Sequence, residues 1–109
     1  MTNDRYKMFE PSGIVDEDAT KQLQIAIRDT VTEGYKHIVI NMQNITFMNS
    51  SAVGGLVLIL KEVRNSGGEM YFCSLSDQVK VILELSRMNL VFRCFSSIRE
   101  FENKIIGLS

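Results

Sequence analysis

The stretch HIVINMQNITFMNSSAVGGLVLILKEVRN, residues 37–65, decides how this chain folds. Residues 37–42 are a dense run of β-branched and apolar side chains, which predicts a central strand buried on both faces. Residues 44–48 predict a connecting loop with apolar anchors. Residues 49–51, Asn-Ser-Ser, precede an apolar helix expected over residues 52–65. A buried strand that leads into an apolar helix favours an α/β fold with a parallel sheet.

The same alternation of strand and helix patterns continues on both sides of this stretch. Short apolar runs predict strands at residues 6–9, 70–73 and 91–92, with Ile14 and Val15 extending the first. Helical patterns predict helices from Asp16 or Asp18 to Gly34, after Asp77 as cap, and after Ser96-Ser97. We therefore expect a single domain over residues 1–109. Its fold is expected to be α/β, with four helices packed against a sheet of about four mostly parallel strands.

Composition points to a globular chain without a polyanionic partner. The 109 residues are 45% hydrophobic with one proline, so a packed core is expected. The 12 Lys and Arg against 13 Asp and Glu leave a net charge of -1, which disfavours nucleic acid or an anionic membrane as a partner. No apolar run approaches the roughly 20 residues that span a bilayer, and residues 1–5 lack the apolar region of a signal peptide. We expect a cytoplasmic monomer.

The sequence carries no recognisable catalytic or metal-binding pattern. The single histidine, His37, has no cysteine or carboxylate at ligand spacing. Gly67-Gly68 follows a helix, so it predicts a helix end and not a phosphate-binding loop. Cys73 and Cys94 lie in apolar surroundings and predict reduced thiols packed as small hydrophobic side chains. We expect no cofactor, no metal ion and no enzymatic activity.

The start of the helix after residue 48 is the most promising site. Asn49-Ser50-Ser51 places an amide and two hydroxyls where free backbone N–H groups and the positive end of the helix dipole converge. A phosphate on Ser50 would be stabilised there, so its effect would fall on a partner. Asn and Ser are also the preferred residues at helix N-caps, so the same three residues could serve as a cap alone.

Several segments together resemble the STAS family, and within it the single-domain anti-sigma factor antagonists. The family signature Asp-Ser-Ser/Thr-Gly-Leu-Gly is matched by Asn49-Ser50-Ser51-Ala52-Val53-Gly54. The other matching segments are Gly13-Ile14-Val15-Asp16 and residues 38–42, 45–48, 67–70, 79–86 and 92–95. Because these segments occur in the family's order over nearly the whole chain, the resemblance is specific.

The resemblance implies a regulated protein-binding role. The phosphoacceptor would be Ser50. The partner would be an anti-sigma factor that is a serine kinase of the histidine-kinase-like ATPase type, with a PP2C-type phosphatase to remove the phosphate. The implied partner-binding residues are Gly13, Asp16, Met48, Asn49, Ser50, Ser51, Ala52, Val53 and Gly54.

The sequence departs from the family pattern at named positions. Asn49 replaces the usual acidic residue and removes a charge beside Ser50, Ala52-Val53 replaces Gly-Leu, and Arg87 stands where glycine is frequent. Little chain precedes Tyr6 for the additional N-terminal strand that many members have. Two alternatives remain open: a STAS scaffold that binds partners without phosphorylation, and a small nucleotide-binding enzyme that uses the helix start at Ser50.

Overall fold

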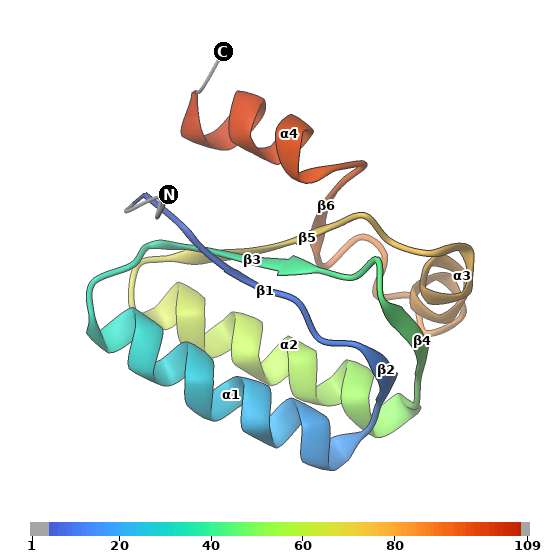
Figure 1. The fold of residues 1–109 in the computed structure, drawn as a ribbon. Coiled ribbons are helices and arrows are strands. Elements are labelled where there is room, and N and C mark those ends of the chain that lie inside the picture. The colour runs from blue at the N-terminus through green and yellow to red at the C-terminus, as the bar shows by residue number, and fades with distance from the viewer. Residues whose placement is uncertain (1–4, 108–109) are drawn as a thin grey trace.

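The computed structural model describes residues 5–107 of the chain. In chain order the elements are β1 (Lys7–Phe9), β2 (Gly13–Val15), α1 (Glu17–Thr32), β3 (His37–Asn41), β4 (Ile45–Met48), α2 (Ser50–Asn65), β5 (Glu69–Cys73), α3 (Asp77–Leu85), β6 (Arg93–Phe95), α4 (Ile98–Phe101) and the π-helical turn η1 (Glu102–Ile106) (Figure 1). The outermost residues of the expected domain, 1–4 and 108–109, lie outside the described residues.

The main sheet has four strands in the order β1-β3-β5-β6, and every neighbouring pair is parallel. Helices α1 and α2 cover one face of this sheet, and α4 with η1 covers the other (Figure 1). Helix α3 lies at one end of the molecule, where it packs against β4. The expected α/β fold, with four helices and a mostly parallel four-stranded sheet, is confirmed.

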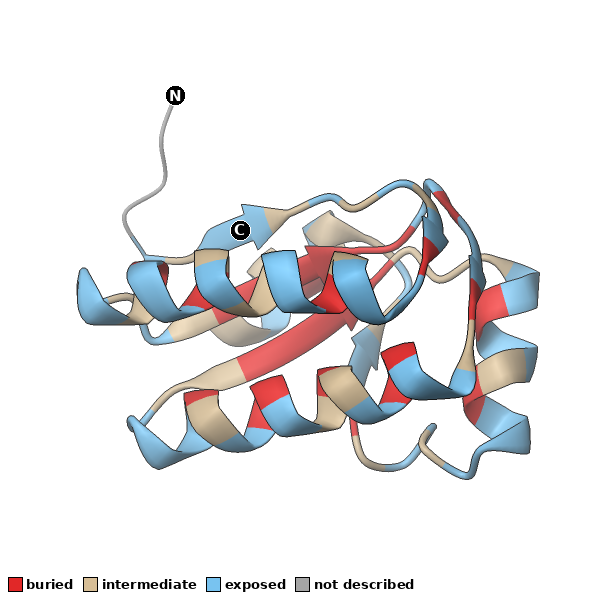
Figure 2. Ribbon diagram, turned by 90° about the horizontal axis from the view of Figure 1, so that it is seen from below, coloured by how far each residue is buried: buried red, intermediate tan, exposed pale blue. Residues whose placement is uncertain are grey.

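Strand alternation divides the interior into two cores. In β3, Ile38 and Ile40 belong to the larger core beneath α1 and α2, whereas Val39 points to the smaller core. Phe101 of α4 closes the smaller core and is fully buried. The central strands are the buried part of the ribbon, with exposed residues on the outer faces of the helices (Figure 2). Burying each large aliphatic side chain in such a core stabilises the fold by about 1.5–3 kcal/mol.

The prediction of a loop at residues 44–48 was wrong. Ile45–Met48 forms β4, which pairs in parallel with β2 as a separate two-stranded sheet. For the same reason Ile14 and Val15 do not extend β1 but form most of β2. Both segments are short, and the partner of each lies about thirty residues away in the chain, so neither signals its pairing locally.

Three element boundaries also differ from the prediction. The last strand is Arg93–Phe95 and not residues 91–92, because Phe92 is buried and stacks on Phe72 with ring centroids 4.3 Å apart. Helix α3 is capped by Ser76, whose hydroxyl accepts from the amide of Val79, and not by Asp77. Helix α2 begins at Ser50, earlier than the expected position 52.

Candidate functional site

The candidate site is the N-terminal end of α2, and Asn49 defines it. Asn49 has extended backbone angles, and its side-chain oxygen Oδ1 accepts a hydrogen bond from the amide of Ala52 at 2.8 Å. The first backbone bond of the helix runs from the amide of Val53 to the carbonyl of Asn49. Ser50 and Ser51 therefore lie ahead of the first helical hydrogen bond, where backbone N–H groups carry the positive end of the helix dipole.

The two hydroxyl residues of the site face solvent, and neither is needed as the helix cap because Asn49 has that role. Ser50 and Ser51 are both exposed, and Asn49 is half-buried. The Ser50 hydroxyl is thus open to a modifying enzyme without any loss of the cap.

Three of the predicted partner-binding residues are buried, unlike the exposed Ser50 and Ser51. Met48, Ala52 and Val53 are buried, with Ala52 fully enclosed. All three belong to the core beneath the helix start, although Met48 and Val53 also line a groove beside Ser50. Their packing in the core anchors the start of α2, where Ser50 lies.

The β2–β4 ladder brings the two predicted parts of the site together. Val15 of β2 pairs with Met48 of β4. The residues that follow them, Asp16 and Asn49, therefore leave the two strands at the same edge of the ladder. Asp16 caps α1 by accepting from the amide of Ala19 at 3.0 Å, as Asn49 caps α2. Helices α1 and α2 therefore begin side by side (Figure 1). Gly13, which opens β2, has a φ of 73°, a left-handed conformation that glycine adopts without strain.

The two glycines of α2 have separate roles. A Cβ on Gly55 would lie 3.0 Å from the Thr20 hydroxyl, so glycine lets α1 and α2 approach closely. A Cβ on Gly54 would meet nothing within 4 Å. Gly54 instead borders a groove of about 410 Å³ between the two helices, which Ser51 and Lys21 also line.

A second groove lies on the other side of Ser50, toward α3. It has a volume of about 380 Å³ and is lined by Phe47, Ser50 and Leu85, among others. Phe47 is 50% exposed and Leu85 is 80% exposed, so this groove presents apolar surface beside the Ser50 hydroxyl. Sequence reasoning missed both residues. The outward position of Phe47 depends on β4, which was predicted as a loop.

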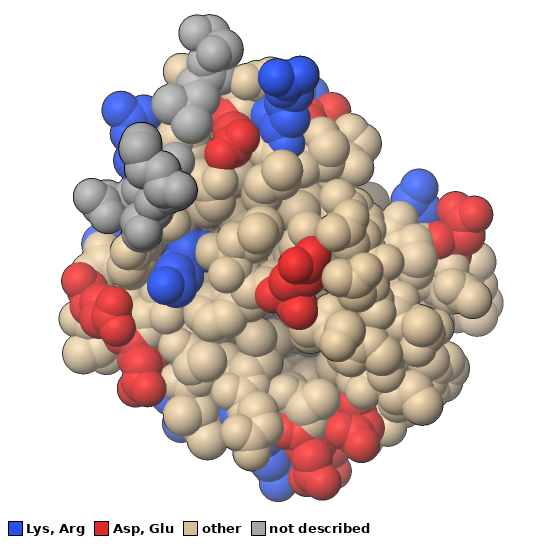
Figure 3. Space-filling model, viewed as in Figure 1, with Lys and Arg blue, Asp and Glu red and all other residues tan. Residues whose placement is uncertain are grey.

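Acidic and basic side chains are dispersed on the face shown in Figure 3, where no basic patch stands out. His37 makes a 3.2 Å contact from Nδ1 to the hydroxyl of Tyr71. Within residues 5–107 no three His, Cys, Asp or Glu side chains are grouped so as to hold a metal ion.

The two cysteines differ in their surroundings. Both are free thiols, but Cys73 is buried whereas Cys94 is exposed, which corrects the expectation that both are packed inside. Desolvation raises the pKa of each thiol. Both therefore remain protonated near neutral pH and are weak nucleophiles.

No helix among the described residues has the length and apolar character needed to cross a bilayer. A family model for the STAS domain matches residues 2–101, which include every element from β1 to α4.

Two similar proteins come from bacteria. The putative anti-sigma factor antagonist BtrV of Bordetella bronchiseptica is 24% identical over 80 residues, which cover 73% of this chain and 69% of that one. The anti-sigma-B factor antagonist of Staphylococcus aureus is 24% identical over 85 residues, covering 78% and 79% of the two chains.

Solved structures give the same fold. The anti-sigma factor antagonist SpoIIAA in its unphosphorylated form superposes with a TM-score of 0.81 at 19% identity, covering 100% of this chain and 95% of that one. The phosphorylated form from Bacillus gives a TM-score of 0.69 at 18% identity, with 94% of each chain covered.

Proposed function

This chain belongs to the STAS domain family, and we propose that within the family it acts as an anti-sigma factor antagonist that phosphorylation of Ser50 switches. The proposed partner is an anti-sigma factor with serine kinase activity, of the histidine-kinase-like ATPase type. A PP2C-type phosphatase would reverse the modification. In this role the chain is a ligand and a kinase substrate and not itself an enzyme. The names of the bacterial relatives support the antagonist role.

The observation that carries the proposal is the separation of the cap from the acceptor. Asn49 satisfies the helix start, so the exposed Ser50 hydroxyl has no structural task there. A phosphate at the first helical position would lie at the positive end of the α2 dipole, where anions are stabilised. The modified chain is therefore expected to stay folded, and the effect of the phosphate is expected to fall on the partner.

The groove beside Ser50 explains why such a phosphate would block binding. In the unmodified state, Phe47 and Leu85 offer apolar surface to a partner next to the small Ser50 hydroxyl. A phosphate adds about two negative charges at that spot. A closely fitted partner would have to bury this charge without a matching cation, which costs several kcal/mol. Since each 1.4 kcal/mol corresponds to about tenfold in affinity, the switch can span several decades.

Asn49 favours a second candidate, a STAS scaffold that binds its partner without being phosphorylated. The neutral carboxamide retains the cap but removes the negative charge that the resemblance expects beside Ser50. Loss of that charge eases the approach of a phosphate, yet it also removes a group that a kinase could recognise. The two candidates share the binding surface and differ only in the modification of Ser50.

Phosphopeptide mapping separates these candidates. The chain, expressed in its host and isolated under phosphatase inhibition, is digested and analysed by mass spectrometry. We expect one phosphate on Ser50, absent from a Ser50→Ala variant and retained in a Ser51→Ala variant. Absence of phosphate from Ser50 under every growth condition, in a protein that still captures its partner, would favour the scaffold.

A further inference from the structure

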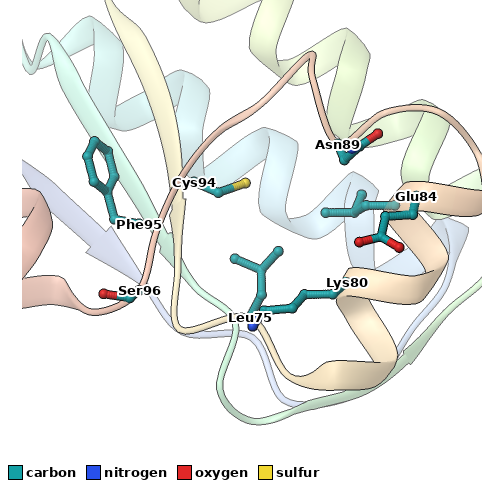
Figure 4. Close-up of a pocket in the computed structure, with 8 residues that line it drawn as sticks. Leu75, Lys80, Glu84, Asn89, Cys94, Phe95 and Ser96 are labelled. Atoms are coloured by element: carbon teal, nitrogen blue, oxygen red, sulfur yellow. The ribbon is translucent and has the colours of Figure 1, made fainter.

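A pocket of about 360 Å³ lies between α3 and the edge strand β6 (Figure 4). Leu75, just after β5, and Ser96, just after β6, both line it. The pocket therefore lies near the carboxyl ends of two neighbouring parallel strands. Its volume is within the range of small-molecule sites. The α3 residues that line it are different from those that line the groove beside Ser50.

Strand alternation in β6 contributes to the apolar part of the pocket lining, to which Asn89 and Ser96 add polar groups. Phe95 points to the smaller core, where its ring packs 5.9 Å from that of Phe101. Cys94, one position earlier, therefore points to the opposite side of the sheet, and Figure 4 shows its sulfur directed into the pocket. Leu75 points into the same space, and Leu83 of α3, which is 1% exposed, also lines it.

The rim of the pocket carries two opposite charges that do not pair. Lys80 and Glu84 are four residues apart on α3, yet they form no ion pair with each other or with another described residue. At the same spacing, Lys21 pairs with Glu17 at 3.4 Å and Lys104 with Glu100 at 4.0 Å.

The order of the charges gives the reason. In the two pairs that form, glutamate precedes lysine along the helix, whereas in α3 lysine precedes glutamate, the less favourable order. An ammonium group and a carboxylate are thus both available beside an apolar space. Figure 4 shows the Glu84 carboxylate turned toward that space and the Lys80 chain running along its lower side toward Leu75.

We propose that this pocket binds a free α-amino acid with an aliphatic side chain. The ligand carboxylate accepts from the ammonium of Lys80, and the ligand ammonium donates to the carboxylate of Glu84. The aliphatic side chain packs against Leu75 and Leu83. Desolvation raises the pKa of the Cys94 thiol, so this side chain lines the pocket as an uncharged group. A simple anion or a simple amine would satisfy only one of the two rim charges, so the site selects a zwitterion. This proposal is independent of the role of Ser50.

Titration of the ¹⁵N-labelled full chain with L-leucine tests the proposal by NMR. We expect saturable shifts of the amide resonances of Leu83, Glu84 and Phe95 at up to millimolar ligand. Lys80→Met and Glu84→Gln should each weaken binding by about tenfold or more, since each removes one charge-assisted hydrogen bond. Lys61→Met, a change of the same kind on the exposed surface of α2, should leave binding unchanged.

Two ligand analogues complete the test. Isocaproate lacks the ammonium group of L-leucine, and isoamylamine lacks its carboxylate. Each should bind at least about tenfold more weakly than L-leucine. The proposal is overturned if L-leucine gives no saturable shifts, if either rim variant binds it as the wild type does, or if either analogue binds as tightly as L-leucine.

Discussion

The carboxamide of Asn49 caps α2 by accepting a 2.8 Å hydrogen bond from the amide of Ala52, and the exposed Ser50 lies between these two residues in the chain. The cap and the proposed phosphoacceptor are therefore neighbours with separate tasks. Stability of the helix start depends on residue 49, whereas the chemistry of the surface depends on residue 50. This division makes the following effects separable by mutation.

Removal of the cap should affect stability. Asn49→Ala loses the hydrogen bond to the amide of Ala52 and should lower the free energy of unfolding by about 1 kcal/mol. Asn49→Asp keeps an acceptor there and adds a charge that the helix dipole favours, so its stability should match or exceed that of the wild type. Urea denaturation measures both. Equal stability of the Ala variant and the wild type would show that the cap contributes nothing.

The two adjacent glycines of α2 should respond differently to alanine. Gly54→Ala enters open space in a helix and should stabilise the protein by about 0.5–1 kcal/mol. Gly55→Ala would press on the Thr20 hydroxyl. That hydroxyl is held in place because it donates a 2.8 Å hydrogen bond to the carbonyl of Glu17. Gly55→Ala should therefore be less stable than Gly54→Ala by about 1–2 kcal/mol. Identical denaturation midpoints would contradict the close packing of α1 on α2.

Arg87 should be a site of stored backbone strain. It has a φ of 59°, in the left-handed region, and follows α3 where the amide of Met88 bonds to the carbonyl of Leu83 at 2.8 Å. This geometry is a Schellman motif, which favours glycine at that position. Arg87→Gly should raise the free energy of unfolding by about 0.5–1 kcal/mol. The matched variant Arg87→Ala keeps the strain and should give no gain; a gain as large as that of glycine would implicate the arginine charge instead.

Tyr6 should make stability depend on pH in alkaline solution. Its hydroxyl donates to Glu102 at 2.5 Å, and burial together with this carboxylate raises its pKa to about 12. Because the folded pKa exceeds the unfolded value of 10.0, this contribution is complete below pH 10.0 and is lost as the pH rises toward 12. Wild type should exceed Tyr6→Phe in stability at neutral pH, and the difference should shrink over that alkaline interval. A constant difference would show that Tyr6 titrates normally.

Sequence reasoning recovered the elements whose signal is local. Residues 37–42 and the apolar helix after Ser50 were predicted because their hydrophobic pattern depends on neighbouring residues alone. Strand β4 was missed because Ile45–Met48 is recognisable as a strand only through its pairing with β2. Phe92 was assigned to the last strand because its burial in the core has the same sequence signature as strand pairing.

The candidate site was predicted in part for the same reason. Position in the sequence was enough to identify Ser50 and Ser51 at a helix start. It could not separate them from Met48 and Val53, which are neighbours in sequence but face the core. The apolar groove with Phe47 and Leu85 combines residues far apart in the chain, so only the fold reveals it.

Partner capture by wild type, Ser50→Asp and Ser50→Ala is the most direct test of the proposed switch. Each purified protein is immobilised and exposed to host lysate, and the retained proteins are identified by mass spectrometry, with Thr32→Asp, an exposed hydroxyl residue at the far end of α1, as the control. We predict that wild type and Ser50→Ala retain a histidine-kinase-like ATPase, and that Ser50→Asp retains at least about tenfold less of it. Equal retention by Ser50→Asp and wild type would contradict the switch and leave Ser50 as one residue of an unregulated binding surface.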